Sequence, residues 1–288
     1  MLTVLAPAKL NLTLEVLAKR SDGFHEIRSV IQTISLSDSL HFQLNQGLTF
    51  KCDNPEWLPE KSLVSKAASL LQETTGCSRG AIVGVTKRIP LVSGLGGDSS
   101  DAAAVLRGLN KFWDLGLSTQ ELVRLASQLG SDVAFFLHGG TALMGGRGEI
   151  VTPLPPLPHM WVVLMVPPVP RLPGKTGQLY ASLKNSHYTD GGITEKFVDM
   201  LRGDKEFGTS LLFNTFENVA FAHQSKINVY RSHAIKVGAP NVHLAGSGPT
   251  LYTLLEDKTQ AEELYLRLQH QRMQPYLAET LASIDQIE

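Results

Sequence analysis

Cysteine is scarce in this chain, and its scarcity limits the classes of protein to consider. Only two cysteines occur among the 288 residues, Cys52 and Cys77, and neither has a histidine or another cysteine nearby at a spacing typical of metal ligands. This pattern excludes a disulfide-dense secreted scaffold and argues against a structural zinc site. We expect both side chains to be reduced thiols in a cytoplasmic protein.

Long apolar runs are lacking as well. The most apolar run, 161–166, is far too short to cross a bilayer. Near the N-terminus, Lys9 and Asn11 follow a short apolar start, so the apolar region of a signal peptide is missing. The formal net charge of -1 at pH 7 offers no general attraction to nucleic acid or to an anionic membrane. We therefore predict a cytoplasmic protein with a small-molecule substrate and no nucleic-acid or membrane partner, either a monomer or a weak homodimer.

The chain does contain enough apolar material for a large core. Hydrophobic residues make up 43% of it and charged residues 18%, a composition typical of globular proteins. Its length allows one large domain or two ordinary ones. The proline-rich stretch from Pro153 to Pro158 interrupts every regular pattern and is the best candidate for a boundary. We predict an α+β chain in two parts, 1–155 and 156–288.

Hydrophobic periodicity places the main elements. Apolar residues recur at helical spacing from Ser62 to Thr75, where Gly76 would end the helix, and Ser118 would cap a second helix over 119–129. Strand patterns are interrupted at Pro7 and again between 36 and 40. The predicted strands are 3–17 with its break, 27–36, 40–44, 81–87, 161–166, 242–244 and 250–255. The other predicted elements are a hairpin over 139–148 and helices at 99–113, 177–183, 194–201, 225–237 and 258–272.

The most informative stretch runs from Ile89 to Ala104 and reads IPLVSGLGGDSSDAAA. Glycines at this point let the backbone turn sharply and come close to a ligand. The polar residues that follow can accept hydrogen bonds from the first N–H groups of a helix, which form a natural seat for phosphate. The alanines would keep the first turn slim enough for a ligand to lie across it. The alternative is a purely structural role, in which a glycine-rich turn merely joins a strand to a helix.

Two familiar phosphate-binding patterns are excluded. The dinucleotide motif G-x-G-x-x-G begins at Gly94 and Gly96, but its third glycine position holds Ser99. Gly174-Lys175-Thr176 suggests a Walker A loop, but the first glycine of that motif would fall on Val169. The loop after Pro90 is therefore a phosphate loop of another kind.

Three separated segments together resemble the GHMP small-molecule kinases: PAKLNLTLEV (7–16), PLVSGLGGDSSDAA (90–103) and LAGSGPT (244–250). Two further segments, DGFHEI (22–27) and GSDVAFFLHGGTALMGGRGE (130–149), are similar to the branch of that family that phosphorylates 4-diphosphocytidyl-2-C-methyl-D-erythritol in the non-mevalonate isoprenoid route. The resemblance implies a fold with an N-terminal half like domain 2 of ribosomal protein S5 and a ferredoxin-like C-terminal half. The active site would lie between the halves.

The implied reaction is transfer of the ATP γ-phosphoryl group, with Mg²⁺, to the tertiary 2-hydroxyl of the acceptor. Lys9 matches the family's catalytic lysine, whose ammonium can stabilise charge on the transferring group. Asp132 matches the aspartate that accepts the hydroxyl proton. Without the flanking motif, Lys9 would be read as a surface lysine and Asp132 as a helix N-cap. The ATP cradle is expected to comprise Val92, Ser93, Gly94, Leu95, Gly96, Gly97, Asp98, Ser99, Ser100, Asp101 and Ala102, and the ligands of the metal stay unassigned.

Phe24 and His25 stand where the family has an aromatic residue and a histidine that bind the cytosine ring. Phe24 keeps a face for stacking but lacks the usual tyrosine hydroxyl. Asn11, Thr176 and Tyr180 lie where the family places further substrate contacts. In isolation, a histidine in such a turn is more often simply exposed, and Tyr180 would be read as a core residue.

Several residues depart from the family pattern. Asp98 adds a negative charge where another glycine is common, so it must point away from the triphosphate or share the metal. Ser62 replaces an asparagine near the adenine, which leaves base selectivity open. The turn Gly246-Ser247-Gly248 fits a segment packed against the lysine region, or else a plain hairpin. We also expect a side chain at Gly96 to crowd the β-phosphate more than it disturbs folding.

Two other functions stay open at this stage. One is a different GHMP kinase, such as a homoserine or mevalonate kinase, against which the Phe24-His25 pair argues. The other is a non-catalytic sensor of a sugar or nucleotide on the same fold, against which the presence of both Lys9 and Asp132 argues.

Overall fold

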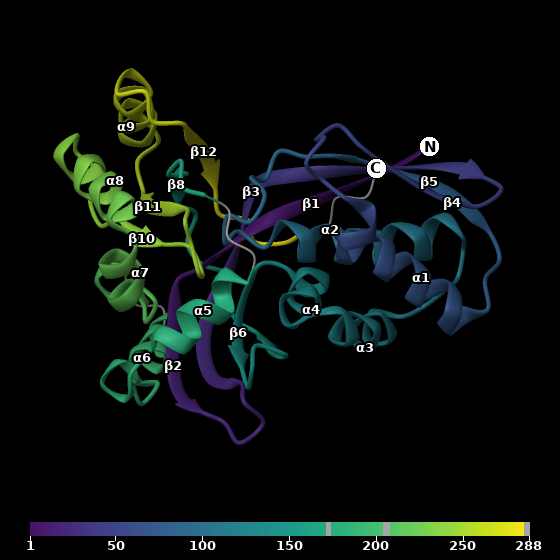
Figure 1. Cartoon of the computed structure of the whole chain (residues 1–288), viewed down its shortest axis with the longest axis horizontal. Coiled ribbons are helices and arrows are strands. Elements are labelled where there is room, and N and C mark those ends of the chain that lie inside the picture. The colour runs from purple at the N-terminus through teal and green to yellow at the C-terminus, as the bar shows by residue number, and fades with distance from the viewer. Residues whose placement is uncertain (171–173, 204–207, 285–288) are drawn as a thin grey trace.

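The computed structural model describes residues 1–170, 174–203 and 208–284 and shows two β-sheets flanked by helices (Figure 1). The first sheet has eight strands, and the second has four strands in the order β10-β11-β8-β12. The strands of the first sheet are β1 (Leu2–Asn11), β2 (Thr13–Lys19), β3 (His25–Asn45), β4 (Leu48–Cys52), β5 (Gly80–Thr86), β6 (Thr141–Gly145), β7 (Ile150–Pro153) and β9 (Phe213–Asn214). Those of the second are β8 (Trp161–Met165), β10 (His243–Leu244), β11 (Leu251–Leu255) and β12 (Pro275–Glu279).

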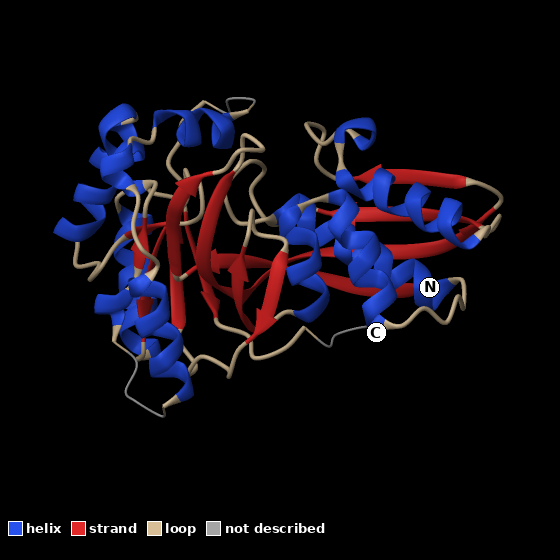
Figure 2. Cartoon of the chain, turned by 90° about the horizontal axis from the view of Figure 1, so that it is seen from below, coloured by secondary structure: helices blue, strands red, loops and turns tan. Residues whose placement is uncertain are grey.

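The helices fall into two groups (Figures 1 and 2). The first four lie together on one side of the first sheet, where they bury the largest apolar cluster. These are α1 (Leu63–Thr75), α2 (Gly97–Phe112), α3 (Thr119–Leu129) and α4 (Ser131–His138). The second group is α5 (Lys175–Ser182), α6 (Gly192–Arg202), α7 (Glu217–His223), α8 (Ser225–Lys236) and α9 (Lys258–His270). Short 3₁₀ turns lie at Pro59–Lys61, Asn185–His187 and Thr209–Leu211.

The central strand β3 is longer than the sequence pattern indicates. It runs unbroken for 21 residues and pairs with β1, β2, β5 and β6. The two separate strands predicted here are wrong, because the interruption is a bulge: Pro7 pairs with Ser37 while Ala8 pairs with Ile34. Pro7 likewise does not end β1, since a proline is tolerated in a strand at a bulge, where its missing N–H costs no ladder hydrogen bond.

Local capping signals predicted two helices correctly. The Ser62 hydroxyl accepts a hydrogen bond from the Val64 N–H at the start of α1, and Gly76 ends that helix with a φ of 68°. Ser118 caps α3 through a reciprocal capping box with Glu121. The predicted hairpin is confirmed as β6 and β7, although it extends to Pro153.

The two parts of the chain share a core. A third apolar cluster joins Ala8 and Leu10 of β1 to Val162 and Leu164 of β8. Strand β9, from the second part, also pairs in parallel with β2 of the first sheet. The boundary predicted near residue 155 lies in the connection between β7 and β8, and as a limit of separate domains it stays a prediction. In the part of the chain that the structure describes, no helix has the length and apolar character needed to cross a membrane.

Candidate functional site

The glycine loop connects β5 to α2, and its backbone turns through two left-handed glycines. Gly94 has a φ of 86° and Gly96 a φ of 75°, conformations that side-chain-bearing residues rarely adopt. Gly96 is the N-cap of α2, and no described side chain caps the helix there. The first N–H groups of α2 therefore keep their hydrogen-bonding capacity for a ligand.

Two cavities share Val92, Gly94 and Gly96 of this loop in their linings. The first, of about 370 Å³, is lined by loop residues together with Trp57, Ser62 and Lys87. The second, of about 830 Å³, extends toward α4 and α5. Among the expected cradle residues, the first cavity contains Val92, Ser93, Gly94, Gly96, Gly97, Asp98 and Ser99.

Four of the expected cradle residues point away from both cavities. Leu95 and Ala102 are fully buried in apolar clusters, so the alanines are small because α2 packs closely on the sheet. The Ser100 hydroxyl donates to the Pro7 carbonyl at 2.7 Å instead of capping the helix. Asp101 is also fully buried, and its carboxylate lies 2.7 Å from the Lys87 ammonium. The side chains of these residues support the loop from beneath, so the expectation that the Ser100 and Asp101 side chains cap the helix is wrong. That the four residues belong to the nucleotide cradle stays a prediction.

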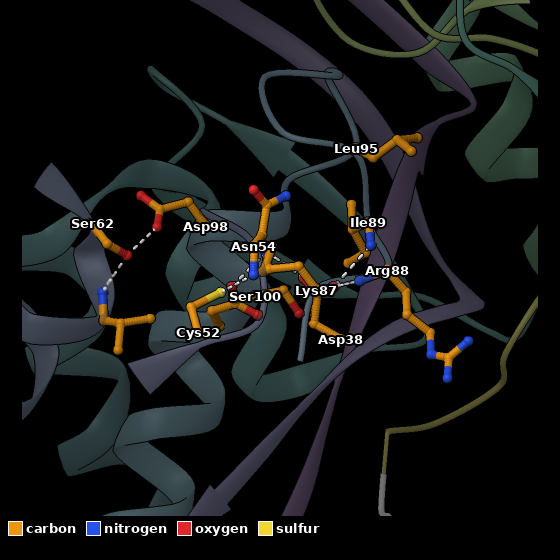
Figure 3. Close-up of polar contacts among 12 residues, drawn as sticks. Asp38, Cys52, Asn54, Ser62, Lys87, Arg88, Ile89, Leu95, Asp98 and Ser100 are labelled. Atoms are coloured by element: carbon orange, nitrogen blue, oxygen red, sulfur yellow. Dashed lines mark hydrogen bonds and ion pairs between the residues drawn. The ribbon is translucent and has the colours of Figure 1, made fainter. Parts of the chain in front are cut away.

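Beneath the loop lies a buried ionic cluster of Asp38, Lys87 and Asp101. Asp38 also accepts hydrogen bonds from the N–H groups of Arg88 and Ile89, at 2.5 and 2.8 Å, so it holds the start of the loop (Figure 3). Burial disfavours the Lys87 ammonium, but the two carboxylates outweigh that effect and raise its pKa above the ordinary value. Burial raises the pKa of the Asp101 carboxyl well above its ordinary range, and Oδ1 of that group has no hydrogen-bond partner among the described residues. The cluster ties β3 and α2 to the chain just after β5.

Asp98 points away from the glycine loop toward α1. Its carboxylate accepts a hydrogen bond from the Ser62 hydroxyl at 2.5 Å (Figure 3). It also accepts one from the Leu63 N–H at 3.1 Å. A negative charge at the N-terminus of α1 also interacts favourably with the dipole of that helix. Of the two arrangements expected for Asp98, the structure therefore has the one that turns the charge away.

We expect Asp98→Ala to lower the free energy of unfolding by about 1 kcal/mol, because α1 loses a capping acceptor at its first turn. Asp98→Asn keeps an acceptor oxygen and should lose less. Urea denaturation of both variants measures the difference, with Asp199→Ala on the exposed face of α6 as the control. A stability unchanged by Asp98→Ala would show that the contact contributes nothing to α1.

Lys9 and Asp132 face each other at the base of the second cavity. Lys9, on β1, is only 5% exposed, so the surface-lysine alternative is wrong. Its ammonium donates to Asn11 Oδ1 at 2.6 Å and lies 3.6 Å from Asp132 Oδ2. Asp132 is in the first turn of α4, whose N-cap is Gly130, so the N-cap alternative is wrong as well. The backbone N–H of Lys9 donates to the carbonyl of Leu95 at 2.9 Å, which fixes the lysine relative to the glycine loop.

The second glycine turn packs against the lysine region, as expected. An added Cβ at Gly246 would lie 3.2 Å from both Lys9 Nζ and Asn11 Oδ1. An added Cβ at Gly94 would lie 2.3 Å from the carbonyl of Ala245. The two glycine segments therefore lie back to back and leave no room for side chains between them.

The structure changes the interpretation of Gly96. A Cβ at this position would lie 2.9 Å from the ring of Phe136 and 3.1 Å from Lys9 Cγ, with a φ of 75°. A larger residue would therefore strain the protein itself and displace Lys9. The expectation that Gly96→Val acts on nucleotide binding more than on folding is wrong, and that variant does not test the cradle.

Aromatic side chains gather at the far end of the second cavity. Phe24 is 54% exposed, and the Arg147 guanidinium lies 4.5 Å above the centre of its ring. His25 stacks on Tyr180 with 4.7 Å between ring centres. Burial and then the charge of Lys19 lower the pKa of His25, so at neutral pH its ring offers one donor and one acceptor nitrogen. Such an end can hold a flat, polar ring.

Most of the residues expected to contact substrate come together in this cavity. Thr176 lies across from the second glycine turn, with its hydroxyl 2.9 Å from that of Ser247. His25 is not among the described residues that line the cavity, although it stacks on Tyr180, which does. The expected residues that do line it are Lys9, Asn11, Phe24, Val92, Gly94, Gly96, Asp132, Thr176 and Tyr180.

Several lining residues were not predicted from the sequence. Arg147 lies in the hairpin between β6 and β7, and Ser247 belongs to the second glycine turn. Lys87 also lines the first cavity. Its position just before the glycine loop is the one feature of the sequence that could have identified it. Lys175 was considered only as part of an incomplete Walker A motif, yet its side chain is buried beside the second cavity.

Two family models match the chain. The model described as the GHMP kinases N terminal domain matches residues 62–140, and the one described as the GHMP kinases C terminal matches residues 198–273. The first match contains the glycine loop and Asp132. The second contains the Gly246–Gly248 turn.

Known proteins are similar over nearly the whole chain. A 4-diphosphocytidyl-2-C-methyl-D-erythritol kinase of Dehalococcoides mccartyi is 50% identical over 99% of this chain and 100% of its own length. A crystal structure of a 4-(cytidine 5'-diphospho)-2C-methyl-D-erythritol kinase superimposes with a TM-score of 0.83 at 31% identity, covering 96% of this chain and 98% of the other. A homoserine kinase of Cytophaga hutchinsonii, at 19% identity and a TM-score of 0.69 over 100% and 96% of the two chains, shares the fold.

Proposed function

Because this chain belongs to the GHMP kinase family, we propose that it transfers the γ-phosphoryl group of ATP to the 2-hydroxyl of 4-diphosphocytidyl-2-C-methyl-D-erythritol. The geometric observation that carries the proposal is the Lys9–Asp132 pair, 3.6 Å apart between the glycine loop and an aromatic-lined pocket. The identity of the acceptor rests on the relatives that are similar over the full length.

The nucleotide occupies the first cavity and the glycine loop. The uncapped N–H groups at the start of α2 bind phosphate oxygens, and the dipole of α2 favours the negative charge. Trp57 and Ser62 also line this cavity, and the adenine is accommodated beside them. Lys87, held by Asp38 and Asp101, keeps the loop in place beneath the phosphates.

In the chemical step, the hydroxyl oxygen of the acceptor attacks the γ-phosphorus while Asp132 accepts the hydroxyl proton. The bond from that phosphorus to the bridging oxygen breaks, and ADP leaves. Lys9 stabilises the charge that develops on the transferring group, and Asn11 orients the ammonium. The reaction therefore depends mainly on positioning and charge compensation.

Magnesium fits this site as a partner of the nucleotide. Within residues 1–170, 174–203 and 208–284, no cluster of three acidic, histidine or cysteine side chains is present. Kinase sites commonly hold Mg²⁺ through substrate phosphates, waters and one or two protein oxygens. The Ser99 hydroxyl, in the first turn of α2, could supply one such oxygen, and the ion would offset phosphate charge.

The cytidine of the acceptor binds at the Phe24 end. Phe24 stacks on the base beneath Arg147, and the neutral His25, supported by Tyr180, hydrogen-bonds to the polar edge of the ring. Thr176 of α5 and Ser247 of the second glycine turn contact the acceptor. Binding far from the reacting hydroxyl then helps to orient it.

This arrangement predicts acceptor selectivity. Phe24→Ala should lose roughly 1–3 kcal/mol of stacking, by analogy with base–aromatic contacts elsewhere. It should therefore raise KM for the cytidylylated acceptor with little effect on KM for ATP, and His25→Ala should act in the same direction. The measurement is phosphoryl transfer to this acceptor and to free methylerythritol phosphate, for wild type and both variants. Equal use of the two acceptors by the wild type would contradict the assignment and leave a less specific GHMP kinase.

The cytoplasmic location and the monomeric or weakly dimeric state expected from composition stay predictions. Size-exclusion chromatography with light scattering would decide the second of them.

A further inference from the structure

Lys175 is a buried lysine that the proposed reaction leaves unused. It is the first residue of α5, and its side chain is only 8% exposed. Its ammonium donates a hydrogen bond to the carbonyl of Gly248. Among the residues that the structure describes, no carboxylate forms an ion pair with it.

This environment is unfavourable for a cation. An ammonium has three N–H donors, and the contact with Gly248 uses one of them. Burial lowers the pKa of Lys175 to about 8, so the group still carries its proton at neutral pH. A buried charge without a compensating partner costs free energy, which an anionic ligand would offset.

The position of Lys175 indicates which anion. Its side chain borders the second cavity and also a smaller one of about 200 Å³ next to Val92 and Ser93 of the glycine loop. The Gly248 carbonyl that it contacts would lie 2.9 Å from a Cβ at Gly94. At the other end of the same turn, a Cβ at Gly246 would lie 3.2 Å from Lys9 Nζ. A single glycine turn thus separates two buried ammonium groups, and both flank the phosphate loop.

We propose that the Lys175 ammonium binds a phosphate oxygen of a reactant, as a second cation beside Lys9. This inference rests on the proposed kinase function. Two reactant groups have the required chemistry and can reach the cavity: the terminal phosphate of the nucleotide and the diphosphate of the acceptor. Either contact would be a charge-assisted hydrogen bond in a partly dry site, which is stronger than one in water.

The alternative role is purely structural, with Lys175 serving only to hold the second glycine turn through Gly248. The two roles differ in what a neutral replacement does. Loss of a phosphate contact weakens one ligand selectively. Loss of a structural tie weakens all ligands together and lowers the unfolding temperature.

The test compares wild type with Lys175→Met, Lys175→Arg and the control Lys236→Met, which removes one exposed charge from α8. Four quantities are measured: the dissociation constants of ADP and of the β,γ-imido analogue of ATP, KM for the cytidylylated acceptor, and the unfolding midpoint. We expect Lys175→Met to weaken one ligand by about 10- to 100-fold, the usual loss for a hydrogen bond to a charged group. Lys175→Arg should recover most of that loss, and Lys236→Met should change nothing.

The pattern of loss identifies the source of the phosphate. Weaker binding of the imido analogue with unchanged ADP binding assigns the terminal phosphate of the nucleotide. A raised KM for the acceptor with unchanged nucleotide binding assigns the acceptor diphosphate. The proposal is overturned if Lys175→Met stays within about twofold of wild type for every ligand, or if all ligands weaken together with a lower midpoint.

A measurement on the wild type keeps the test decisive if Lys175→Met does not fold. The ¹³Cε resonance of Lys175, assigned by its absence from Lys175→Arg, should shift when the imido analogue or the acceptor is added. A resonance that neither ligand moves overturns the proposal. If the wild type binds the imido analogue but does not phosphorylate the acceptor, the proposed function fails while the nucleotide arm of this test still stands.

Discussion

Asp132→Asn is expected to lower kcat by about 10²–10⁴-fold, the range found for positioned acid–base groups. The amide has nearly the same shape as the carboxylate and can remain beside Lys9, but it cannot accept the proton of the attacking hydroxyl. KM for ATP should change little, because the nucleotide contacts the glycine loop rather than Asp132. Steady-state kinetics with both substrates varied measures kcat and the two KM values separately.

The control for this variant is Asp199→Asn, which removes an equal charge from the exposed face of α6 and should keep full activity. A near wild-type kcat for Asp132→Asn would show that Asp132 is not the base. Lys9 alone would then have to activate the hydroxyl.

Lys9→Met is expected to lower kcat by about 10²–10³-fold through lost charge stabilisation, as when one oxyanion-stabilising donor is removed. Methionine preserves most of the aliphatic length, so the packing beside Gly96 is kept while the ammonium is lost. Lys9→Arg should not restore activity, because Asn11 and Gly246 leave no space for a planar guanidinium around the present Nζ position. Rate measurements under saturating substrates, with circular dichroism to check folding, give the result.

The double variant Lys9→Met/Asp132→Asn tests whether the pair acts as one unit. The two groups lie 3.6 Å apart, so their effects should combine to far less than the product of the single losses. Multiplicative losses would mean that the two residues contribute independently, and recovery by Lys9→Arg would mean that charge alone matters at this position.

The residues of the candidate site were predicted from the sequence more completely than their roles. Lys9, Asn11, Phe24, Asp132 and Tyr180 come together around one cavity although they are distant in sequence. Their selection depended on a family resemblance carried by short motifs, since composition and periodicity alone leave Lys9 as a surface lysine. Burial rules out a surface role for Lys9, and the N-cap at Gly130 rules out a capping role for Asp132. Both observations depend on the folded structure and not on adjacent residues alone.

In the glycine loop, the backbone conformation could be predicted from the sequence, but the orientation of the polar side chains could not. Its positive-φ glycines and the helix after it follow from local chemistry, because a backbone that must turn without side chains selects glycine. Which polar side chains of the loop face a ligand does not follow in this way. Ser100 and Asp101 have the same residue types as a helix cap, yet Ser100 bonds to Pro7 of β1 and Asp101 to Lys87, just after β5.

By itself, the sequence determined the features that depend on a few adjacent residues: the serine caps of α1 and α3, the end of α1 at Gly76, the β6–β7 hairpin and the glycine-rich start of α2. Only the tertiary structure decided the features that depend on distant segments meeting. Strand β3 is continuous because β1 and β5 pair along it across a bulge. Asp98 turns toward α1, and Lys175 reaches the glycine loop through Gly248, because packing brings those segments together. The contacts of Asp98 with Leu63 and of Lys175 with Gly248 join residues that are 35 and 73 positions apart. Hydrophobic periodicity, which reports on neighbouring residues, therefore cannot predict them.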